Sequence, residues 1–145
     1  MSNEVEVILV EDNMSDATLT IRALRKHHLA NNLVHLKDGA EAIEYIVNGG
    51  THQGRTLSSK PKLILLDLKM PKVSGIEVLR QLKGNPKTKT IPVVVLTSSK
   101  EDPDVKECYE LGVNSYVVKP VDFDAFFGAV SELGLYWLLL NEAPK

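Results

Sequence analysis

Polar side chains follow several short apolar runs of this sequence, and their types suit metal and phosphate chemistry. Glu11 and Asp12 follow the first run, Asp67 the third, Thr97 the fourth and Lys119 the fifth. If these runs are parallel strands, their carboxyl ends lie at one edge of a sheet, where such sheets form their binding sites. If the first and third strands are neighbours, three carboxylates converge there, and they repel one another unless a cation balances them. We therefore expect a divalent cation between Glu11, Asp12 and Asp67.

The residues around this acidic cluster indicate that the cation binds together with a phosphate group. A hard cation such as Mg2+ (or Mn2+) takes carboxylate, carbonyl, water and phosphate oxygens as ligands. Thr97 supplies a hydroxyl and Lys119 a positive charge, and both can hold phosphoryl oxygens that the cation does not reach. Asp67 is then the natural nucleophile, because a carboxylate oxygen can attack phosphorus.

The elements that position these residues alternate between strands and helices. The apolar runs show little alternation, as expected of strands buried in a parallel sheet. Apolar residues between them recur at spacings of three and four, which is typical of amphipathic helices. Strands are expected at residues 5–10, 33–36, 63–66, 91–96 and 115–118. Five strand-helix units predict a doubly wound α/β domain, a parallel sheet with five helices on both faces.

The helices are delimited by their apolar stripes and by breaker residues. The first is expected to bury Ala17, Leu19, Ile21, Leu24 and Leu29, the second Ala42, Ile43, Ile46 and Val47, and the third Ile76, Val78, Leu79 and Leu82. The fourth is expected to start at Pro103 with Asp102 as its cap, to bury Val105, Tyr109 and Leu111, and to end at Gly112. A long exposed loop without periodicity is expected at residues 48–60.

Length and composition restrict the function. With 145 residues and a net charge of -2, the chain is expected to be one domain without room for a separate output domain and without a field that attracts nucleic acid. The acidic start of the chain is unlike a secretory signal, and each apolar run is too short to span a bilayer. We therefore expect a cytoplasmic protein that binds neither nucleic acid nor membrane.

Four segments of the sequence together resemble the receiver domain of two-component response regulators. They are VILVEDN at 7–13, LILLDLKMPKVSG at 63–75, VVVLTSS at 93–99 and NSYVVKP at 114–120. The resemblance implies a flavodoxin-like fold with sheet order 2-1-3-4-5. It also implies a regulator, not an enzyme on external substrates, that accepts a phosphoryl group on Asp67 from a sensor histidine kinase with the help of Mg2+.

The resemblance assigns roles to further residues. It implies that the Lys69 main-chain carbonyl is a metal ligand beside Glu11, Asp12 and Asp67. Thr97 is implied as the switch hydroxyl, Lys119 as the lysine that pairs with phosphate, and Tyr116 as the switch aromatic. The bond before Pro120 is expected to be cis, and Lys69 and Ser99 are expected to influence the lifetime of the phosphoryl group.

The C-terminal segment, expected to be a helix over about 122–141, carries more apolar surface than one core-facing stripe needs. Phe123, Phe127, Tyr136 and Trp137 are candidates for a dimer interface, because aromatic residues are enriched in such surfaces. The face expected to pair consists of the fourth helix, fifth strand, fifth helix and C-terminus. The ending YWLLLNE and the loop at 48–60 also resemble single-domain regulators that partner bacterial phytochromes, so a bacteriophytochrome is a candidate kinase.

Three other functions fit the residues less well than this interpretation. An aspartyl-phosphate phosphatase needs a second acid near its nucleophile, and residues 68–71 supply none. A flavin binder is disfavoured because Glu11 and Asp12 would repel the flavin phosphate. A degenerate receiver that acts without phosphorylation is disfavoured by the complete acidic set together with Thr97 and Lys119.

The remaining candidates for chemistry receive no role from the sequence. His27, His28, His35 and His52 lack the spacing of metal ligands. Cys108 is expected to be a packing residue within the fourth helix.

Overall fold

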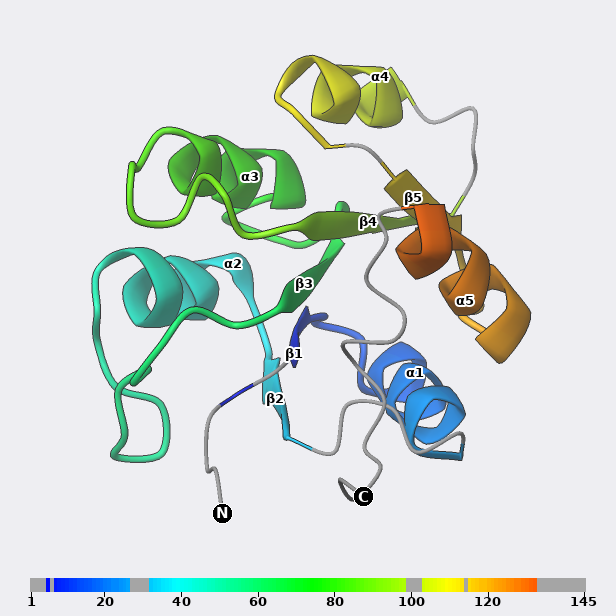
Figure 1. Cartoon of the computed structure of the whole chain (residues 1–145), viewed down its shortest axis with the longest axis horizontal. Coiled ribbons are helices and arrows are strands. Elements are labelled where there is room, and N and C mark those ends of the chain that lie inside the picture. The colour runs from blue at the N-terminus through cyan, green and yellow to red at the C-terminus, as the bar shows by residue number, and fades with distance from the viewer. Residues whose placement is uncertain (1–4, 6, 27–31, 99–102, 114, 133–145) are drawn as a thin grey trace.

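A five-stranded sheet forms the centre of the molecule (Figure 1). The computed structural model describes residue 5 and residues 7–26, 32–98, 103–113 and 115–132. The strands are β1 (Val7–Val10), β2 (Leu33–Leu36), β3 (Leu63–Asp67), β4 (Val93–Thr97) and β5 (Ser115–Val118). All neighbouring strands are parallel and their order is β2-β1-β3-β4-β5, so the predicted fold and strand order are confirmed.

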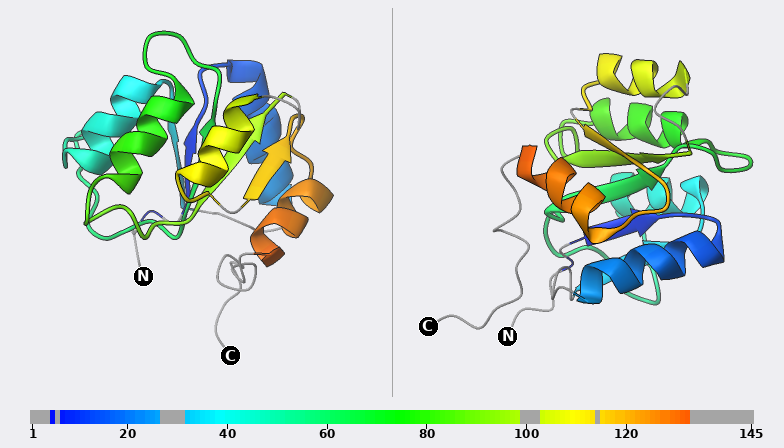
Figure 2. Two further views of the ribbon diagram at one scale, coloured as in Figure 1. Left: turned by 90° about the horizontal axis from the view of Figure 1, so that it is seen from above. Right: turned by 90° about the vertical axis from the view of Figure 1, so that its right-hand side faces the viewer.

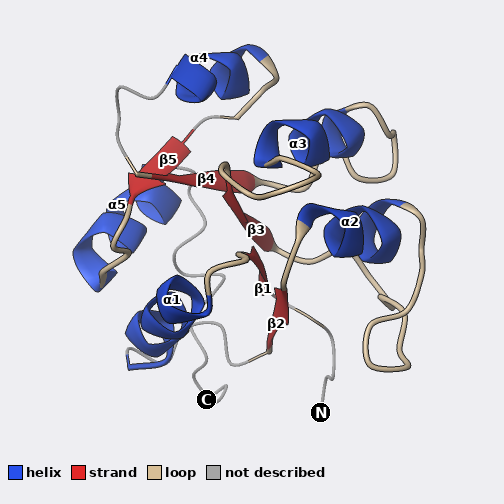
Figure 3. Ribbon diagram, turned by 180° about the vertical axis from the view of Figure 1, so that it is seen from behind, coloured by secondary structure: helices blue, strands red, loops and turns tan. Residues whose placement is uncertain are grey.

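Helices cover both faces of the sheet (Figures 1 and 2). One face carries α1 (Met14–Lys26) and α5 (Phe123–Glu132). The other carries α2 (Gly39–Ala42), which continues into the π-helical segment η1 (Ile43–Val47), together with α3 (Gly75–Lys83) and α4 (Pro103–Glu110). The view from behind separates the same two groups of helices (Figure 3). The arrangement is the doubly wound one that the alternation of elements predicts.

Alternate residues of the central strands divide the core into two clusters. Val7 and Leu9 of β1 pack with residues of α1 and α5, whereas Ile8 and Val10 pack with residues of η1, α3 and α4. Every residue of β1, β3 and β4 is buried, as expected for strands with helices on both sides. Because both faces are covered, the ends of these strands are the places where polar side chains can gather.

The edge strand β5 departs from the predicted pattern. Ser115 and Val117 are buried, but Tyr116 is half-buried and Val118 is 37% exposed, so the strand alternates. An edge strand has a neighbour on one side only, and helices cover less of it than they cover of β3. The other strand predictions differ mainly at their ends: β1 begins at Val7, β3 includes Asp67, and β4 runs from Val93 to Thr97.

Two predicted core positions on helices are wrong. Leu19 of α1 is 48% exposed, and Thr20 is buried instead. The helical period places Thr20 between Ala17 and Leu24 on the buried face, and its hydroxyl avoids an unsatisfied state by donating to the Asp16 carbonyl at 2.9 Å. Tyr109 of α4 is 44% exposed, whereas the neighbouring Cys108 is buried in the core.

The segment at 48–60 is mostly exposed but is not without structure. His52 and Arg55 form an isolated antiparallel bridge around a tight turn, in which Gln53 and Gly54 have φ values of 53° and 80°. The imidazole of His52 also lies 3.7 Å from the Glu41 carboxylate. Leu29, Asp102 and the helix predicted beyond residue 132 lie outside the described residues. Within the described part of the chain, no helix is long and apolar enough to cross a bilayer.

Candidate functional site

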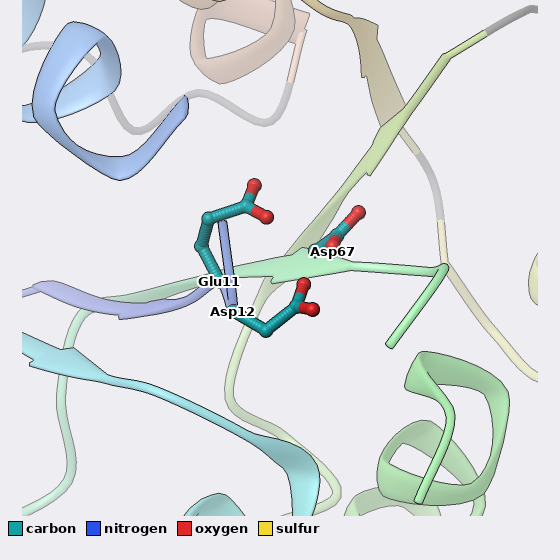
Figure 4. Close-up of side chains that lie close together, drawn as sticks. All are labelled: Glu11, Asp12 and Asp67. Atoms are coloured by element: carbon teal, nitrogen blue, oxygen red, sulfur yellow. The ribbon is translucent and has the colours of Figure 1, made fainter. Parts of the chain in front are cut away.

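Three carboxylates gather at the carboxyl ends of β1 and β3 (Figure 4). The register pairs Val10 with Leu66, so Glu11 and Asp67 occupy the next positions of two adjacent strands. One carboxylate oxygen each of Glu11, Asp12 and Asp67 lies within 4.8 Å of the others. Glu11 is 0% and Asp67 1% exposed, whereas Asp12 is half-buried. The predicted convergence of the three acids is confirmed.

Lys119 directly follows the carboxyl end of β5, and its ammonium group lies among these acids. Its Nζ is 3.1 Å from Asp67 Oδ1, 3.2 Å from Glu11 Oε1 and 3.2 Å from Asp16 Oδ2. The main chain beside it is fixed, because Lys119 N donates to the Thr97 carbonyl at 2.8 Å. The Lys119–Pro120 peptide bond is cis. One positive charge therefore faces a group of four carboxylates: Glu11, Asp12, Asp16 and Asp67.

The pKa values of the site reflect this excess of negative charge. Burial and the neighbouring Asp67 carboxylate raise the pKa of Glu11 to about 7, although Lys119 acts in the opposite direction. Burial also raises the pKa of Asp12. Burial alone would lower the pKa of Lys119, but its contacts with Asp67, Glu11 and Asp16 outweigh burial and raise it. Burial and mutual repulsion of the carboxylates raise the free energy of the folded state, and a bound cation would reduce this cost.

The donor set fits a divalent cation. Asp67 Oδ1 is buried and forms an ion pair with the Lys119 ammonium at 3.1 Å, but it accepts no hydrogen bond from the described residues. An unsatisfied buried carboxylate oxygen is costly, and metal coordination is one way to satisfy it. The two acids beside it, Glu11 and Asp12, complete a set of the oxygen ligands that Mg2+ prefers.

Two residues that the sequence did not assign support the backbone and charge of this site. The imidazole Nε2 of His35 donates to the Glu11 main-chain carbonyl at 2.8 Å, from the neighbouring strand β2. Asp16 contacts Lys119 from the first turn of α1. Neither role is visible in the sequence, because each contact joins residues that only the folded chain brings together.

Gly75 brings α3 against the end of β3. A Cβ atom at this position would lie 2.2 Å from the Asp67 carbonyl oxygen and 2.7 Å from the Leu68 Cα. The Gly75 amide donates to the Leu68 carbonyl at 3.0 Å, and the Ser74 hydroxyl caps the helix by accepting from the Glu77 amide at 3.3 Å. The residue that carries the central carboxylate is thus packed directly against a capped helix.

The comparison with protein families decides how this site is classified. Residues 7–131 match the family described as the response regulator receiver domain. The chain belongs to the response regulator receiver domain family. The match includes β1, β3, β4 and β5, whose ends carry the acids, Thr97 and Lys119.

Individual relatives of this receiver domain cover nearly its whole length. The bacteriophytochrome response regulator AtBRR is 49% identical in a solved structure with a TM-score of 0.84, covering 96% of this chain and 99% of that one. The probable methanogenesis regulatory protein FilR2 of Methanothrix harundinacea is 41% identical, covering 95% of this chain and 86% of its own.

The response regulator Rcp1 of Synechocystis is a further relative, 39% identical over 91% of this chain and 88% of its own length. Its solved structure, in a Mn(2+)-bound form, has a TM-score of 0.72 and covers 97% of this chain and 99% of that one. The phosphorylated cyanobacterial phytochrome response regulator RcpA is 38% identical in a solved structure with a TM-score of 0.73. The match covers 93% of this chain and 94% of that one.

The other residues singled out in the sequence lie around the crevice of this receiver domain. Thr97 is the buried last residue of β4. The ammonium of Lys69 lies 3.1 Å from Asp104 Oδ2, so this side chain bridges the β3–α3 loop to the first turn of α4. Tyr116 is half-buried on β5, with its ring edge-on to Tyr109 at a centroid distance of 6.2 Å.

Of the residues expected to form a dimer interface, those on α5 have their main chain within the described part of the chain. Phe127 of α5 is 40% exposed. Phe123 is the first residue of α5, and its side chain lies outside the described part of the chain. Ser99, Tyr136 and Trp137 lie outside the described residues.

Proposed function

We propose that this protein accepts a phosphoryl group on Asp67 from the phosphohistidine of a sensor histidine kinase. The observation that carries the proposal is the buried Asp67 carboxylate, which has one oxygen without a hydrogen-bond partner in the described part of the chain and lies between two acids and a lysine. In this step an Asp67 oxygen forms a bond to phosphorus as the phosphorus–nitrogen bond of the donor breaks. The departing imidazole keeps the electron pair of the broken bond and takes up a proton.

The residues of the crevice have distinct tasks in this transfer. A divalent cation held by Glu11, Asp12, Asp67 and the Lys69 main-chain carbonyl would neutralise charge on the transferring group. Lys119 would pair with a phosphoryl oxygen, because its Nζ already lies 3.1 Å from Asp67 Oδ1. Thr97, at the end of the adjacent strand β4, would bind another phosphoryl oxygen through its hydroxyl.

Two relatives support these assignments. Rcp1 has been solved in a Mn(2+)-bound form, and RcpA in a phosphorylated form. Both are similar to this chain over more than nine-tenths of its length. The same chemistry in this chain would use the residues at the ends of β1, β3, β4 and β5.

The phosphoacceptor is tested by incubation with acetyl phosphate and MgCl2, followed by intact-mass measurement. The wild-type protein should gain one phosphoryl group, and Asp67→Asn should gain none. Asp124→Asn, an exposed acid in the first turn of α5, is the matched control and should be phosphorylated like wild type. Equal incorporation into Asp67→Asn would overturn the assignment, and no incorporation into the wild type would favour a degenerate receiver.

We also propose that phosphorylation changes the face formed by α4, β5 and α5, which serves self-association. This face exposes Tyr109, Val118 and Phe127 by 44%, 37% and 40%, and a groove of about 510 Å³ runs along β5 and α5. Rotation of Tyr116 would alter it directly, because its ring contacts Tyr109. Light scattering with and without beryllofluoride is the test. A monomer in every condition would contradict the proposal, and Phe127→Ser should weaken a dimer if one forms.

The kinase partner is proposed from similarity. AtBRR and RcpA are response regulators of phytochromes, and AtBRR is 49% identical to this chain. FilR2, at 41% identity, is named for methanogenesis regulation, so a test of the partner is needed. Phosphotransfer profiling against the histidine kinases of the same genome should show the fastest transfer from a bacteriophytochrome. A faster transfer from another kinase would assign the partner differently.

A further inference from the structure

Among the residues that the structure describes, the Lys119 ammonium has three carboxylate partners, and one of them lies outside the acidic cluster that fits a cation. Glu11 and Asp67 belong to that cluster, whereas Asp16 does not. The Asp16 contact, at 3.2 Å, is as short as the Glu11 contact. The Lys119 side chain is 18% exposed and that of Asp16 37%, so this pair is less screened than one on the open surface.

The start of α1 holds Asp16 in this position. Its amide donates to the Asn13 side chain at 2.9 Å, which caps the helix, and its carbonyl accepts from the Thr20 hydroxyl at 2.9 Å. Asn13 is linked in turn to the acidic cluster, because its main-chain N–H donates to Glu11 Oε2 at 3.3 Å. The Asp16 carboxylate therefore reaches Lys119 from a fixed main chain.

A cation in the acidic cluster changes the surroundings of Lys119. The Glu11 and Asp67 carboxylates that contact the ammonium are also the ones that offer oxygens to the cation, and two cations at such short range repel each other strongly. Lys119 then needs an anionic partner on the side away from the cluster. Of its three carboxylate partners, Asp16 alone is free of that competition.

We propose that Asp16 is a positioning residue that holds the Lys119 ammonium on the α1 side while Glu11 and Asp67 turn to a divalent cation. The proposal rests on the metal-dependent phosphotransfer proposed above and adds to it a residue outside the acidic cluster. Its consequence is that Asp16 strengthens metal binding through Lys119, and only weakly through its own charge.

A double-mutant cycle separates these two routes. Mn2+ affinity is measured by electron paramagnetic resonance on the wild type, Asp16→Asn, Lys119→Gln and the double variant, all without phosphoryl donor. Asp16→Asn should weaken binding about fivefold in the presence of Lys119, in the range of a partly screened ion pair. In the Lys119→Gln background the same change should weaken binding less than about twofold.

Two further variants control for folding and for general charge effects. Asp16→Glu keeps the charge and should retain most of the wild-type affinity. Asp124→Asn removes the equivalent acid from the first turn of α5 and should bind Mn2+ like the wild type. Circular dichroism shows whether each variant is folded.

The outcomes distinguish failure of this inference from failure of the proposed function. Unchanged Mn2+ affinity in a folded Asp16→Asn variant would overturn the inference, and so would an equal loss with and without Lys119, which would indicate a long-range field effect. In either case Asp67 phosphorylation of the wild type would still support the function. A wild type that binds no Mn2+ and takes up no phosphoryl group would overturn both.

Discussion

The crevice at the ends of β1 and β3 differs from the face formed by α4, β5 and α5 in how firmly its parts are held. At the crevice, Glu11 and Asp67 are almost fully buried, and His35, Lys119 and Gly75 contact their side chains or main chains. On the other face, β5 alternates between buried and exposed residues. The proposed phosphoryl chemistry and the proposed response therefore occupy regions of different packing.

The difference has a physical basis in the sheet. Central strands have partners on both sides and helices on both faces. This packing holds the residues at their ends rigidly, so that like charges can be kept close together despite their repulsion. An edge strand has one partner, and a change in its side chains disturbs fewer contacts. A phosphorylation switch needs both properties, because a rigid site binds the phosphoryl group and a more tolerant face can respond to it.

The largest effect is expected from Gly75→Ala in the crevice. The added methyl group would collide with the Asp67 carbonyl oxygen and the Leu68 Cα, both of which are main-chain atoms that cannot move independently. We expect the free energy of unfolding to fall by about 2 to 3 kcal/mol, which urea denaturation measures. A loss below about 0.5 kcal/mol would show that the crevice is as tolerant as the opposite face.

Glu11→Gln should stabilise the protein in EDTA at pH 8, by about 1 to 2 kcal/mol, because it removes a buried charge from a repulsive cluster. The pKa of Glu11 is raised from 4.5 to about 7 in the folded protein. The folded state then binds the proton more tightly, so wild-type stability contributed by this group rises as pH falls from about 7 toward 4.5 and is lost as pH rises.

Urea unfolding of Glu11→Gln and wild type across this pH range measures the effect. The advantage of the variant should shrink at the acidic end, where the Glu11 carboxyl is protonated. A variant that is less stable than the wild type at pH 8 would mean that the Lys119 contact outweighs the repulsion.

Gly128→Ala is the counterpart of Gly75→Ala on the tolerant side. Apart from the helix's own nearby backbone, no atom of the described residues lies within 4 Å of a Cβ at this position on α5, and Gly128 is exposed. Alanine favours the helix over glycine, so we expect a gain of about 0.5 to 1 kcal/mol in thermal unfolding of the monomer. Destabilisation would reveal a contact that the helix makes at this point.

The smallest effect is expected from Val118→Thr on β5, where 37% of the residue is exposed. The change keeps the shape and adds a hydroxyl that solvent can reach, so stability should stay within about 0.5 kcal/mol. Val10→Thr on β1 is the matched control, because Val10 is 0% exposed. The hydroxyl of the introduced threonine would be buried there, which should lower the free energy of unfolding by about 1 to 3 kcal/mol. Similar losses from both changes in urea denaturation would remove the distinction between centre and edge.

Apolar runs without alternation identify the central strands, because burial on both faces is a short-range pattern. The strand order that brings Glu11, Asp12 and Asp67 together was instead implied by the resemblance to receiver domains. The exposure of Leu19 and the alternation in β5 could not be obtained in this way, because they depend on how far each helix covers the sheet.

The supporting contacts of the site were also beyond sequence patterns. His35 reaches Glu11 through the pairing of β2 with β1, a contact between residues 24 positions apart. Asp16 reaches Lys119 across 103 positions. Such contacts depend on side-chain directions at strand and helix ends, which periodicity does not specify.

The short turn from Glu11 to Asp16 is both the end of β1 and the beginning of α1. Asn13 joins the two, since its amide donates to Glu11 and its side chain accepts from the Asp16 amide. Opening the first turn of α1 would therefore disturb the carboxylates, and a ligand that orders the carboxylates would suppress that opening. Amide hydrogen exchange at the start of this helix becomes a measure of site occupancy, read without any label at the site.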